Sequence, residues 1–254
     1  MKVSADELRE RQSRSQRAFY RMVAPGSPNG QVVVLDRAVL ASIVPAMPER
    51  SLPNAVTYTD PDAIEPVLDE LSSLYDSAGV KAWTVWVRPE DDNLAFAMER
   101  AGHKLDGTPE LMGAVIGDCD LTPRRELELV TGSWEDVAFC NNVAYGLPDG
   151  SFDPLIKGLP AEARRYVAIG RDGDPLGCVV SAHIKGDCYI AFVATQPEAR
   201  GHGIASDLMR AALREGLEAG CVTTTLESSK LGRGLYTALG YQSLGALRMY
   251  EKRK

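Results

Sequence analysis

The sequence lacks any run of apolar residues long enough to cross a membrane, since no stretch approaches the roughly 20 unbroken apolar residues that a spanning helix needs. Its first 21 residues are charged and contain neither an apolar core nor a small-residue cleavage site. We therefore expect no membrane span, no secretory leader and a cytoplasmic protein.

Cysteine and histidine are scarce. The five cysteines are scattered, odd in number and contain no C-x-x-C pair, which argues against a disulfide framework and against a thiolate zinc cluster. The three histidines include no pair at metal-ligand spacing, so we expect no metal site.

A basic excess is also absent. The net charge is −7, and the excess of acid lies before residue 121, where 12 Lys and Arg stand against 19 Asp and Glu; the rest of the chain has 16 of each. This asymmetry suggests two units, and it argues against binding to duplex nucleic acid. We interpret the arginine-rich residues 9–21 as the solvated face of a surface helix rather than a nucleic-acid arm. The acidic surface serves solubility or attracts a cationic substrate.

The remaining composition is that of an ordinary globular protein, with 44% hydrophobic and 25% charged residues. Periodicity and turn residues predict an α/β (α+β) fold with a boundary in the polar stretch 118–125, giving domains at residues 1–120 and 121–254. The expected helices are residues 6–22, 63–78, 93–101, 134–145, 203–219 and 232–239, and residues 152–163 form an amphipathic piece. The expected strands are residues 31–35, 54–58, 82–87, 126–130, 166–169, 176–184, 188–195, 222–226 and 244–250, with a further strand region at residues 104–116.

The ends of the two parts repeat each other. Gly79 precedes a strand and a helix that ends at Gly102, and Gly220 precedes a strand and a helix that ends at Gly240; the paired glycines are 23 and 20 residues apart. The pattern predicts a duplicated fold.

A buried strand at residues 188–195 leads into a glycine-containing turn that opens a long helix. The first amides of a helix have no partner within it and carry partial positive charge, and glycines let a phosphate approach them closely. The third glycine of the Rossmann fingerprint is missing, and no G-K-[ST] follows. The turn is therefore typical of another kind of pyrophosphate site.

Two motifs resemble the GNAT superfamily of acetyl-CoA-dependent N-acyltransferases over about residues 126–252. Residues 200–205, RGHGIA, resemble its [QR]-x-x-G-x-[GA] loop, and residues 234–241, GLYTALGY, resemble its L-Y-x-x-L-G-[FY] segment. The resemblance implies two tandem GNAT-like domains, each with a mixed, mostly antiparallel sheet flanked by helices.

The resemblance also implies residue roles. Tyr236 would protonate the departing thiolate, and no metal would take part. The residues expected to bind acetyl-CoA through the strand, the loop and the following segment are Val193, Ala194, Thr195, Arg200, Gly201, His202, Gly203, Ile204, Ala205 and Ser229. The general base stays open between Glu227, His183 and a water chain.

The first part resembles a degenerate copy. Asp60 and Asp62 precede its main helix where the second part has the glycine loop, and Met98 aligns with Tyr236. Carboxylates at that position repel a pyrophosphate. We expect this part neither to bind acetyl-CoA nor to catalyse, but to shape the substrate cleft or mediate dimerisation.

The expected function is acetyl transfer from acetyl-CoA to a primary amine, of a small molecule rather than a protein, by direct attack on the thioester. The alternative is a catalytically silent CoA-binding sensor or scaffold that regulates a protein partner. We expect no nucleic-acid or membrane partner, and a monomer or a homodimer.

Overall fold

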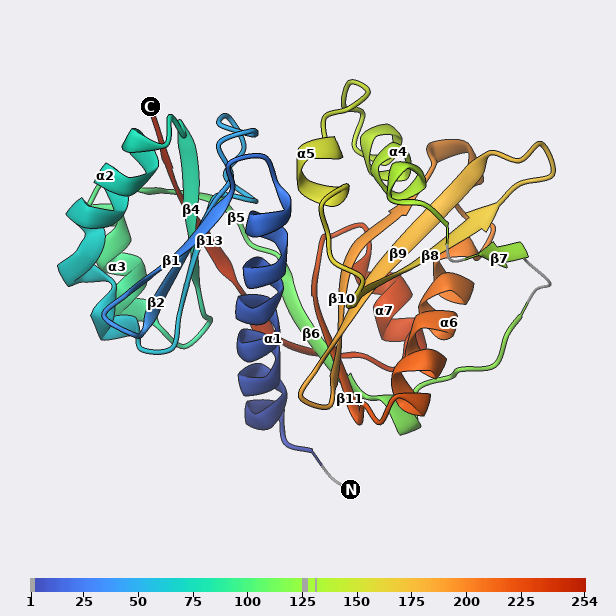
Figure 1. Ribbon diagram of the computed structural model, residues 1–254. Helices are drawn as coiled ribbons and strands as arrows, with labels where there is room; N and C mark the ends of the chain where they lie inside the picture. Colours follow the sequence, from blue (N-terminus) through green and yellow to red (C-terminus); the bar gives the residue numbers. More distant parts are fainter. Residues whose placement is uncertain (1–2, 125–127, 131) are drawn as a thin grey trace.

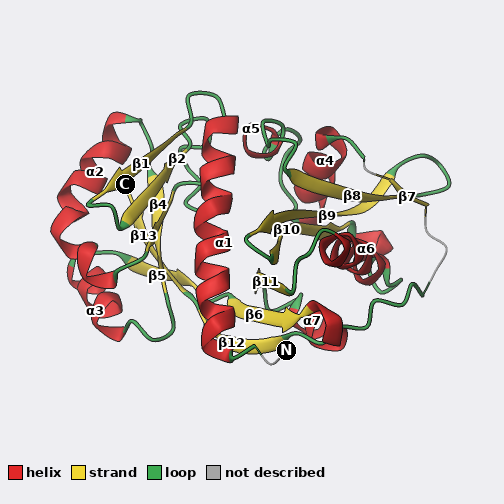
Figure 2. Cartoon of the chain, turned by 60° about the horizontal axis from the view of Figure 1, so that its bottom comes forward, coloured by secondary structure: helices red, strands yellow, loops and turns green. Residues whose placement is uncertain are grey.

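The computed structural model describes residues 3–124, 128–130 and 132–254, with residues 128–130 as backbone. Two sheets lie side by side, and the long helix α1 (Ala5–Gly26) stands between them (Figures 1 and 2). We call the two sheets with their own helices the first and the second unit.

The first unit has the strand order β1-β2-β3-β4-β13-β5. Two 3-10 turns, η1 (Pro61–Ala63) and η2 (Glu65–Val67), and the helices α2 (Leu68–Ser77) and α3 (Asp92–Arg100) accompany its sheet. Its strands are β1 (Gln31–Leu35), β2 (Val39–Ile43), β3 (Ala55–Tyr58), β4 (Ala82–Val87), β5 (Lys104–Gly107) and β13 (Arg248–Arg253).

The second unit has the strand order β12-β6-β11-β10-β9-β8-β7. Its strands are β6 (Glu110–Val115), β7 (Glu128–Val130), β8 (Ala163–Ile169), β9 (Pro175–Ile184), β10 (Asp187–Thr195), β11 (Thr223–Ser228) and β12 (Gln242–Ala246). Its helices and turns are η3 (Ile116–Asp118), α4 (Trp134–Ala144), α5 (Asp153–Ile156), η4 (Pro197–Ala199), α6 (Ile204–Glu218) and α7 (Arg233–Leu239).

The two sheets repeat one pairing pattern. Among the described strands, β3–β4 is the parallel pair of the first sheet and β10–β11 that of the second, and the other neighbours run antiparallel. In the second unit α4 and α5 pack with α1 on one face, and α6 and α7 pack on the other. The expected fold class of two tandem units, each a mixed and mostly antiparallel sheet with helices, is confirmed.

The two sheets exchange strands. β13, from the C-terminal end of the chain, lies between β4 and β5, while β6 lies between β11 and β12. The expected strand region 104–116 holds two strands in different sheets and breaks at Pro109, which has no N–H for a ladder. The expected single strand 244–250 is wrong, because it spans the end of β12 and the start of β13. The amide of Leu247 donates to the Pro109 carbonyl at 2.9 Å, where the two connections cross. Each sheet therefore contains a strand from the other side of residue 120, and a domain boundary there remains a prediction.

Helix α1 is not the surface helix that we expected. Its apolar and small polar side chains face both sheets, and these residues are buried: Leu8, Gln12, Ser15, Gln16, Phe19, Tyr20, Val23 and Ala24. Arg9 Nε donates to the Leu244 carbonyl at 2.8 Å, and Arg17 Nη1 donates to the Ala38 carbonyl at 2.8 Å. Arginine side chains of this helix thus bind backbone carbonyls of both units, so the expected solvated face is wrong for Arg9 and Arg17.

Two other segments, the expected helix 63–78 and the amphipathic piece 152–163, contain only short helices. Residues 63–78 divide into η1, η2 and α2, because Pro66 lacks the amide that a continuous helix requires. In the segment 152–163, α5 has one turn, since Gly158 and Pro160 disfavour its continuation. The expected strand 126–130 is seen as β7, and residues 126 and 127 lie outside the described residues.

A buried ion pair fixes the segment between the units to α6. Asp207 Oδ1 lies 2.8 Å from Arg210 Nη1, and both side chains are 4% exposed. Arg210 Nε also donates to the Asp120 carbonyl at 3.1 Å. We expect Asp207→Ala to lower the free energy of unfolding by about 3 kcal/mol, because the buried guanidinium then keeps only the Asp120 carboxylate, whose Oδ2 lies 3.7 Å from Arg210 Nη2. Urea unfolding measures this loss, and Asp207→Ala combined with Arg210→Met should recover part of it; equal stability of Asp207→Ala and wild type would contradict the prediction.

Candidate active site

Strand β10 opens away from β11. The two strands pair in parallel from Asp187 and Thr223 to Tyr189 and Thr225, although β10 continues to Thr195. A bulge between Ala191 and Ala194 turns β10 at this point, and Phe192 adopts a φ of 48°, which is strained for a residue with a side chain. Beyond the bulge, the edge of β10 that faces β11 has no strand partner among the described residues. The expected contact residues Val193, Ala194 and Thr195 lie on this free edge.

The glycine loop has the conformation of an anion-binding turn. Gly201 and Gly203 have φ angles of 77° and 76°, and Gly203 is the N-cap of α6 without a side-chain cap. A Cβ on Gly201 would meet nothing within 4 Å. The backbone amides of residues 201–206 donate to no described residue, so they are available to a ligand at the positive end of α6. The loop also includes the expected residues His202, Ile204 and Ala205.

The side chains of this loop hold its shape. Arg200 Nε donates to the Thr195 carbonyl at 3.2 Å, and Arg200 Nη2 donates to the Ala144 carbonyl at 2.9 Å. His202 Nδ1 lies 2.9 Å from the Arg200 carbonyl. Arg200 thus ties the loop to β10 and to the end of α4, while its charge stays near the loop amides.

Tyr236 lies on α7, the helix that follows β11. Its side chain is 6% exposed, and its ring packs against Tyr241 at a centroid distance of 5.8 Å. Burial raises the pKa of Tyr236 above its ordinary value, with smaller contributions from Tyr145 and Glu227. Its hydroxyl bonds to no described residue. Tyr236 therefore carries a proton throughout the neutral range and has a hydroxyl free to bond a ligand.

Ser229 lies in the exposed loop before α7. Its Oγ accepts a hydrogen bond from the Gly232 amide at 3.2 Å, so this hydroxyl shapes the loop. A contact of Ser229 with acetyl-CoA stays a prediction.

Glu227 lies on β11 and points to the face covered by α1. Its Oε2 accepts a hydrogen bond from the Tyr189 hydroxyl at 2.7 Å, and its Oε1 accepts one from the Gln12 side-chain amide. Burial raises the pKa of Glu227 to about 7, since it outweighs the two hydrogen bonds, and the nearby Asp187 also raises it. A half-buried carboxylate with such a pKa changes protonation near neutrality, as a general base must.

His183, the other candidate base, lies on the opposite face of the second sheet. Its ring stands near α6, because a Cβ on Gly216 would be 3.6 Å from His183 Nε2. Burial and the charge of Arg164 lower its pKa. The sheet thus separates His183 from Glu227, and of these two side chains the geometry favours Glu227 as the base.

The equivalent position in the first unit is closed. Past Val56 and Val85, β3 and β4 no longer pair, but the Tyr58 hydroxyl bridges this gap: it donates to Asp91 Oδ2 and accepts from the Arg88 amide. Asp60 caps the turn η1 by accepting from the Asp62 amide at 3.1 Å, so its carboxylate occupies the anion position.

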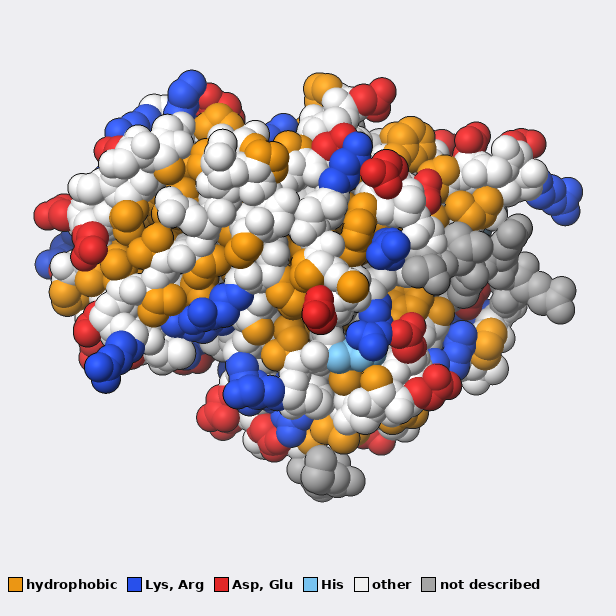
Figure 3. Space-filling view, viewed as in Figure 1, with side chains coloured by type: hydrophobic (Ala, Val, Ile, Leu, Met, Phe, Trp, Pro, Cys, Tyr) orange, Lys and Arg blue, Asp and Glu red, His pale blue; other side chains and the backbone are white. Residues whose placement is uncertain are grey.

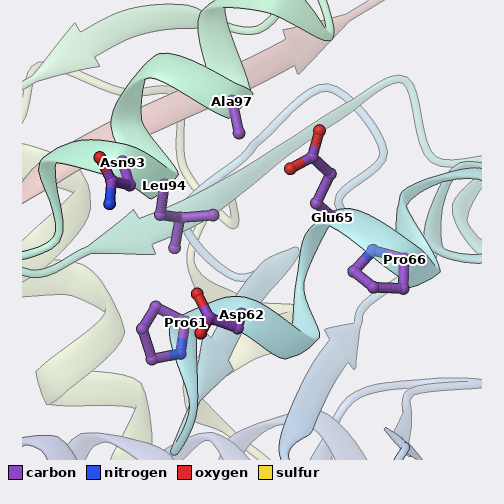
Figure 4. Close-up of a pocket in the computed structure, with 7 residues that line it drawn as sticks. All are labelled: Pro61, Asp62, Glu65, Pro66, Asn93, Leu94 and Ala97. Atoms are coloured by element: carbon purple, nitrogen blue, oxygen red, sulfur yellow. The ribbon is translucent and has the colours of Figure 1, made fainter.

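A pocket of about 410 Å³ lies between η1, η2 and α3, and Figure 4 shows the carboxylates of Asp62 and Glu65 at it. By topology it corresponds to the space between the glycine loop and α7. Met98, at the position of Tyr236, is fully buried. The carboxylates of Asp62 and Glu65 oppose a pyrophosphate in this pocket, and the Tyr58 hydroxyl closes the gap between β3 and β4.

Three residues at the site were not singled out from the sequence. Gln12 and Tyr189 bind Glu227, and Phe192 forms the bulge of β10. Side chains alternate between the two faces of a strand, so the sequence alone places Tyr189 and Asp187 on the same face of β10. This shared polar face could have indicated Tyr189 as a site residue. No local signal identifies Gln12, because its contact with β11 joins residues 215 positions apart.

On the face drawn in Figure 3, acidic and basic side chains are interspersed, and no large basic patch is seen on it. Within the described residues no helix is long and apolar enough to cross a membrane. The same residues contain no group of three or more His, Cys, Asp or Glu that could hold a metal ion.

The open β10 edge, the bulge and the glycine turn before α6 define the fold class of GNAT acyltransferases. Solved structures agree: a GCN5-related N-acetyltransferase from Kribbella flavida superposes with a TM-score of 0.69 at 16% identity, covering 95% of both chains. One from Sphaerobacter thermophilus gives 0.59 at 17% identity, over 87% of this chain and 82% of that one. A tandem GNAT protein from the clavulanic acid biosynthesis pathway gives 0.61 at 12% identity, over 99% and 97%.

The sequence profile of the acetyltransferase (GNAT) family matches residues 133–241, which lie in the second unit. Residues 133–241 thus form an acetyltransferase (GNAT) domain, and this match supports acetyl transfer as the general reaction. The tandem GNAT structure shows the same fold across both units. No curated protein matches the chain.

Proposed function

We propose that the second unit transfers an acetyl group from acetyl-CoA to a primary amine of a small molecule in the cytoplasm, by direct attack of the amine on the thioester. The observation that carries this proposal is the junction of the free β10 edge with the glycine loop, whose amides have no partner among the described residues. Bound acetyl-CoA supplies the activated acetyl thioester.

The chain's own groups suit this ligand. Backbone amides of residues 201–206 and the charge of Arg200 bind the pyrophosphate, helped by the dipole of α6. The free edge of β10 at Val193, Ala194 and Thr195 offers backbone groups to the pantetheine arm and to the thioester carbonyl.

Two side chains handle the protons. Glu227 accepts the proton that the amine loses as the C–N bond forms, and Tyr236 donates a proton to the sulfur as the C–S bond breaks. Solvent then restores both groups. Glu227 is half-buried beneath α1, and this enclosure favours a small acceptor over the lysine of a folded protein.

The first unit, in this proposal, takes no part in acetyl-CoA binding. Its counterpart gap is bridged by Tyr58 and Asp91, and Asp60 and Asp62 occupy its anion position. We therefore expect calorimetric titration of acetyl-CoA to show one site per chain.

Gly201→Glu should weaken acetyl-CoA binding about 10- to 100-fold, because it puts a carboxylate beside the amides that receive the pyrophosphate. Gly220→Glu is the matched control: Gly220 also has a positive φ, 86°, and open space around its Cβ, but lies past the other end of α6. Both substitutions place a glutamate at a glycine of positive φ, so the difference in acetyl-CoA affinity between the two variants reports the contribution of the loop.

The same protein is then assayed for release of free CoA thiol with a panel of small amines. Turnover with at least one amine, lost in Gly201→Glu and kept in Gly220→Glu, supports the proposal. Two sites per chain would show that the first unit binds too, and absence of acetyl-CoA binding would refute the proposal.

A further inference from the structure

Helix α1 reaches the candidate base of the second unit. Gln12 is 2% exposed, and its Nε2 donates to Glu227 Oε1. The Tyr189 hydroxyl donates to Glu227 Oε2 at 2.7 Å. Each carboxylate oxygen thus accepts one bond from the protein and keeps a lone pair for another donor.

The turn of α1 that carries Gln12 is itself fixed to the sheet. Ser15 Oγ donates to Asp187 Oδ2 at 2.8 Å, and Asp187 also accepts from Thr223 and Thr225 at 2.8 and 2.6 Å. Arg11 Nη1 donates to Thr223 Oγ1 at 3.2 Å. This buried network ties α1 to β10 and β11, so Gln12 has little freedom to leave Glu227.

The groups around Glu227 come from three elements besides its own. Asp187 and Tyr189 face it from β10, Tyr20 and Gln12 from α1, and Tyr236 from α7. Among these, Tyr189 and Gln12 are the groups that donate hydrogen bonds to the carboxylate. Removing either bond disfavours the ionised form.

We propose that Gln12 is a positioning residue for acetyl transfer: it holds Glu227 in the orientation, and in the ionised state, that receives a proton from the acceptor amine. This inference rests on the proposed function of the second unit. It follows that the active site is completed by the N-terminal helix, which lies between the two units.

The test compares Gln12→Met with Gln16→Met in the full-length protein. Methionine keeps the length of the side chain and removes the donor. Gln16 lies one turn further along α1, is 5% exposed and bonds to no described residue, so it controls for a buried Gln→Met change in the same helix.

In Gln12→Met we expect the acid limb of kcat/KM to move to higher pH by about one unit and kcat to fall about tenfold, with the Kd of acetyl-CoA unchanged. In Gln16→Met the limb should stay in place. If the acid limb of kcat/KM lies at the same pH in Gln12→Met as in wild type, the positioning role of Gln12 is refuted, while the proposed function of the second unit stands.

A second readout is independent of turnover. Carbon-13 labelling of glutamate, with Glu227→Gln to assign the signal, measures the pKa of Glu227 directly, and we expect it to rise in Gln12→Met. If that variant does not fold, Gln12→Asn shortens the amide by one methylene and replaces it in both measurements. An unchanged pKa of Glu227 in a folded variant refutes the positioning role. A wild-type protein that acetylates no amine refutes the proposed function instead, and this result is known before any variant is made.

Discussion

Glu227→Gln is expected to lower kcat/KM for acetyl transfer by about 10²- to 10⁴-fold, the range that a positioned general base supplies. Glutamine has nearly the same shape and can still bond Gln12 and Tyr189, but it cannot accept the proton of the amine. The affinity for acetyl-CoA should be unchanged, because Glu227 lies on the α1 face while the loop amides lie before α6. Thiol release and calorimetry on the same preparation measure the two quantities.

The pKa of Glu227 determines in which direction kcat/KM changes with pH. Burial raises the pKa of Glu227 to about 7, so the active, ionised base is lost as pH falls through that value. Wild-type kcat/KM should therefore fall more steeply with decreasing pH below about pH 7, and this added steepness should vanish in Glu227→Gln. Deprotonation of the acceptor gives a second limb near its own pKa, about 10 for an alkylamine, and that limb should change with the amine and not with the variant.

A surface glutamate provides the control. Glu218→Gln, at the exposed end of α6, should leave both limbs and the rate as in wild type. The stability of Glu227→Gln at different pH values checks that the variant is folded. Because the pKa of Glu227 is higher in the folded than in the unfolded protein, the protonated carboxyl stabilises the folded state at low pH. This stability is lost as pH rises from about 4.5 through about 7. The variant should thus gain stability over wild type at pH 8. Full activity with an unchanged acid limb would instead point to a water chain.

The sequence predicts the repeated architecture better than it predicts the joining of the two units. Gly102 and Gly240 end equivalent helices, and this local signal was enough to expect a duplication. The exchange of β6 and β13 is not local. A β-rich run has the same side-chain pattern whichever sheet receives it, and the crossing depends on a tertiary contact between Leu247 and Pro109.

Helix α1 shows the same limit. Its arginines lie mostly among polar residues, which is typical of a surface helix, yet Arg9 and Arg17 bind backbone carbonyls of different sheets. Long side chains can bury their stems and carry their charge to a carbonyl at the edge of a sheet. Nothing within residues 9–21 shows that such carbonyls lie nearby.

At the candidate site, the backbone signals were readable and the proton network was not. Gly201 and Gly203 adopt the positive φ angles that the loop motif requires, although their role toward acetyl-CoA remains a prediction. Glu227 is one of several carboxylates at strand ends until Gln12 and Tyr189 are placed on its oxygens. A base depends on its environment, and here that environment comes from residues distant in the sequence.

Tyr236→Phe is expected to lower kcat by about 10²-fold or more and to leave the Kd of acetyl-CoA and the stability nearly unchanged. The ring packs against Tyr241, and a Cβ on Gly232 would be 2.9 Å from Tyr236 Cε2, so phenylalanine keeps these contacts. The hydroxyl bonds to no described residue, so its removal leaves no partner unsatisfied among them. What is lost is the proton for the departing sulfur.

This variant also separates an enzyme from a CoA-binding sensor. Because burial raises the pKa of Tyr236, the phenol stays protonated and adds no limb near neutrality; the acid limb of Glu227 should remain in Tyr236→Phe while the whole profile moves down. A phenol is a weaker acid than a thiol, whose pKa is ~8.5, so the transfer to sulfur is uphill and requires direct contact in the bound complex. A sensor has no use for that contact. Equal turnover in wild type and Tyr236→Phe would remove Tyr236 from the mechanism, and one-to-one acetyl-CoA binding without turnover in either protein would favour the sensor.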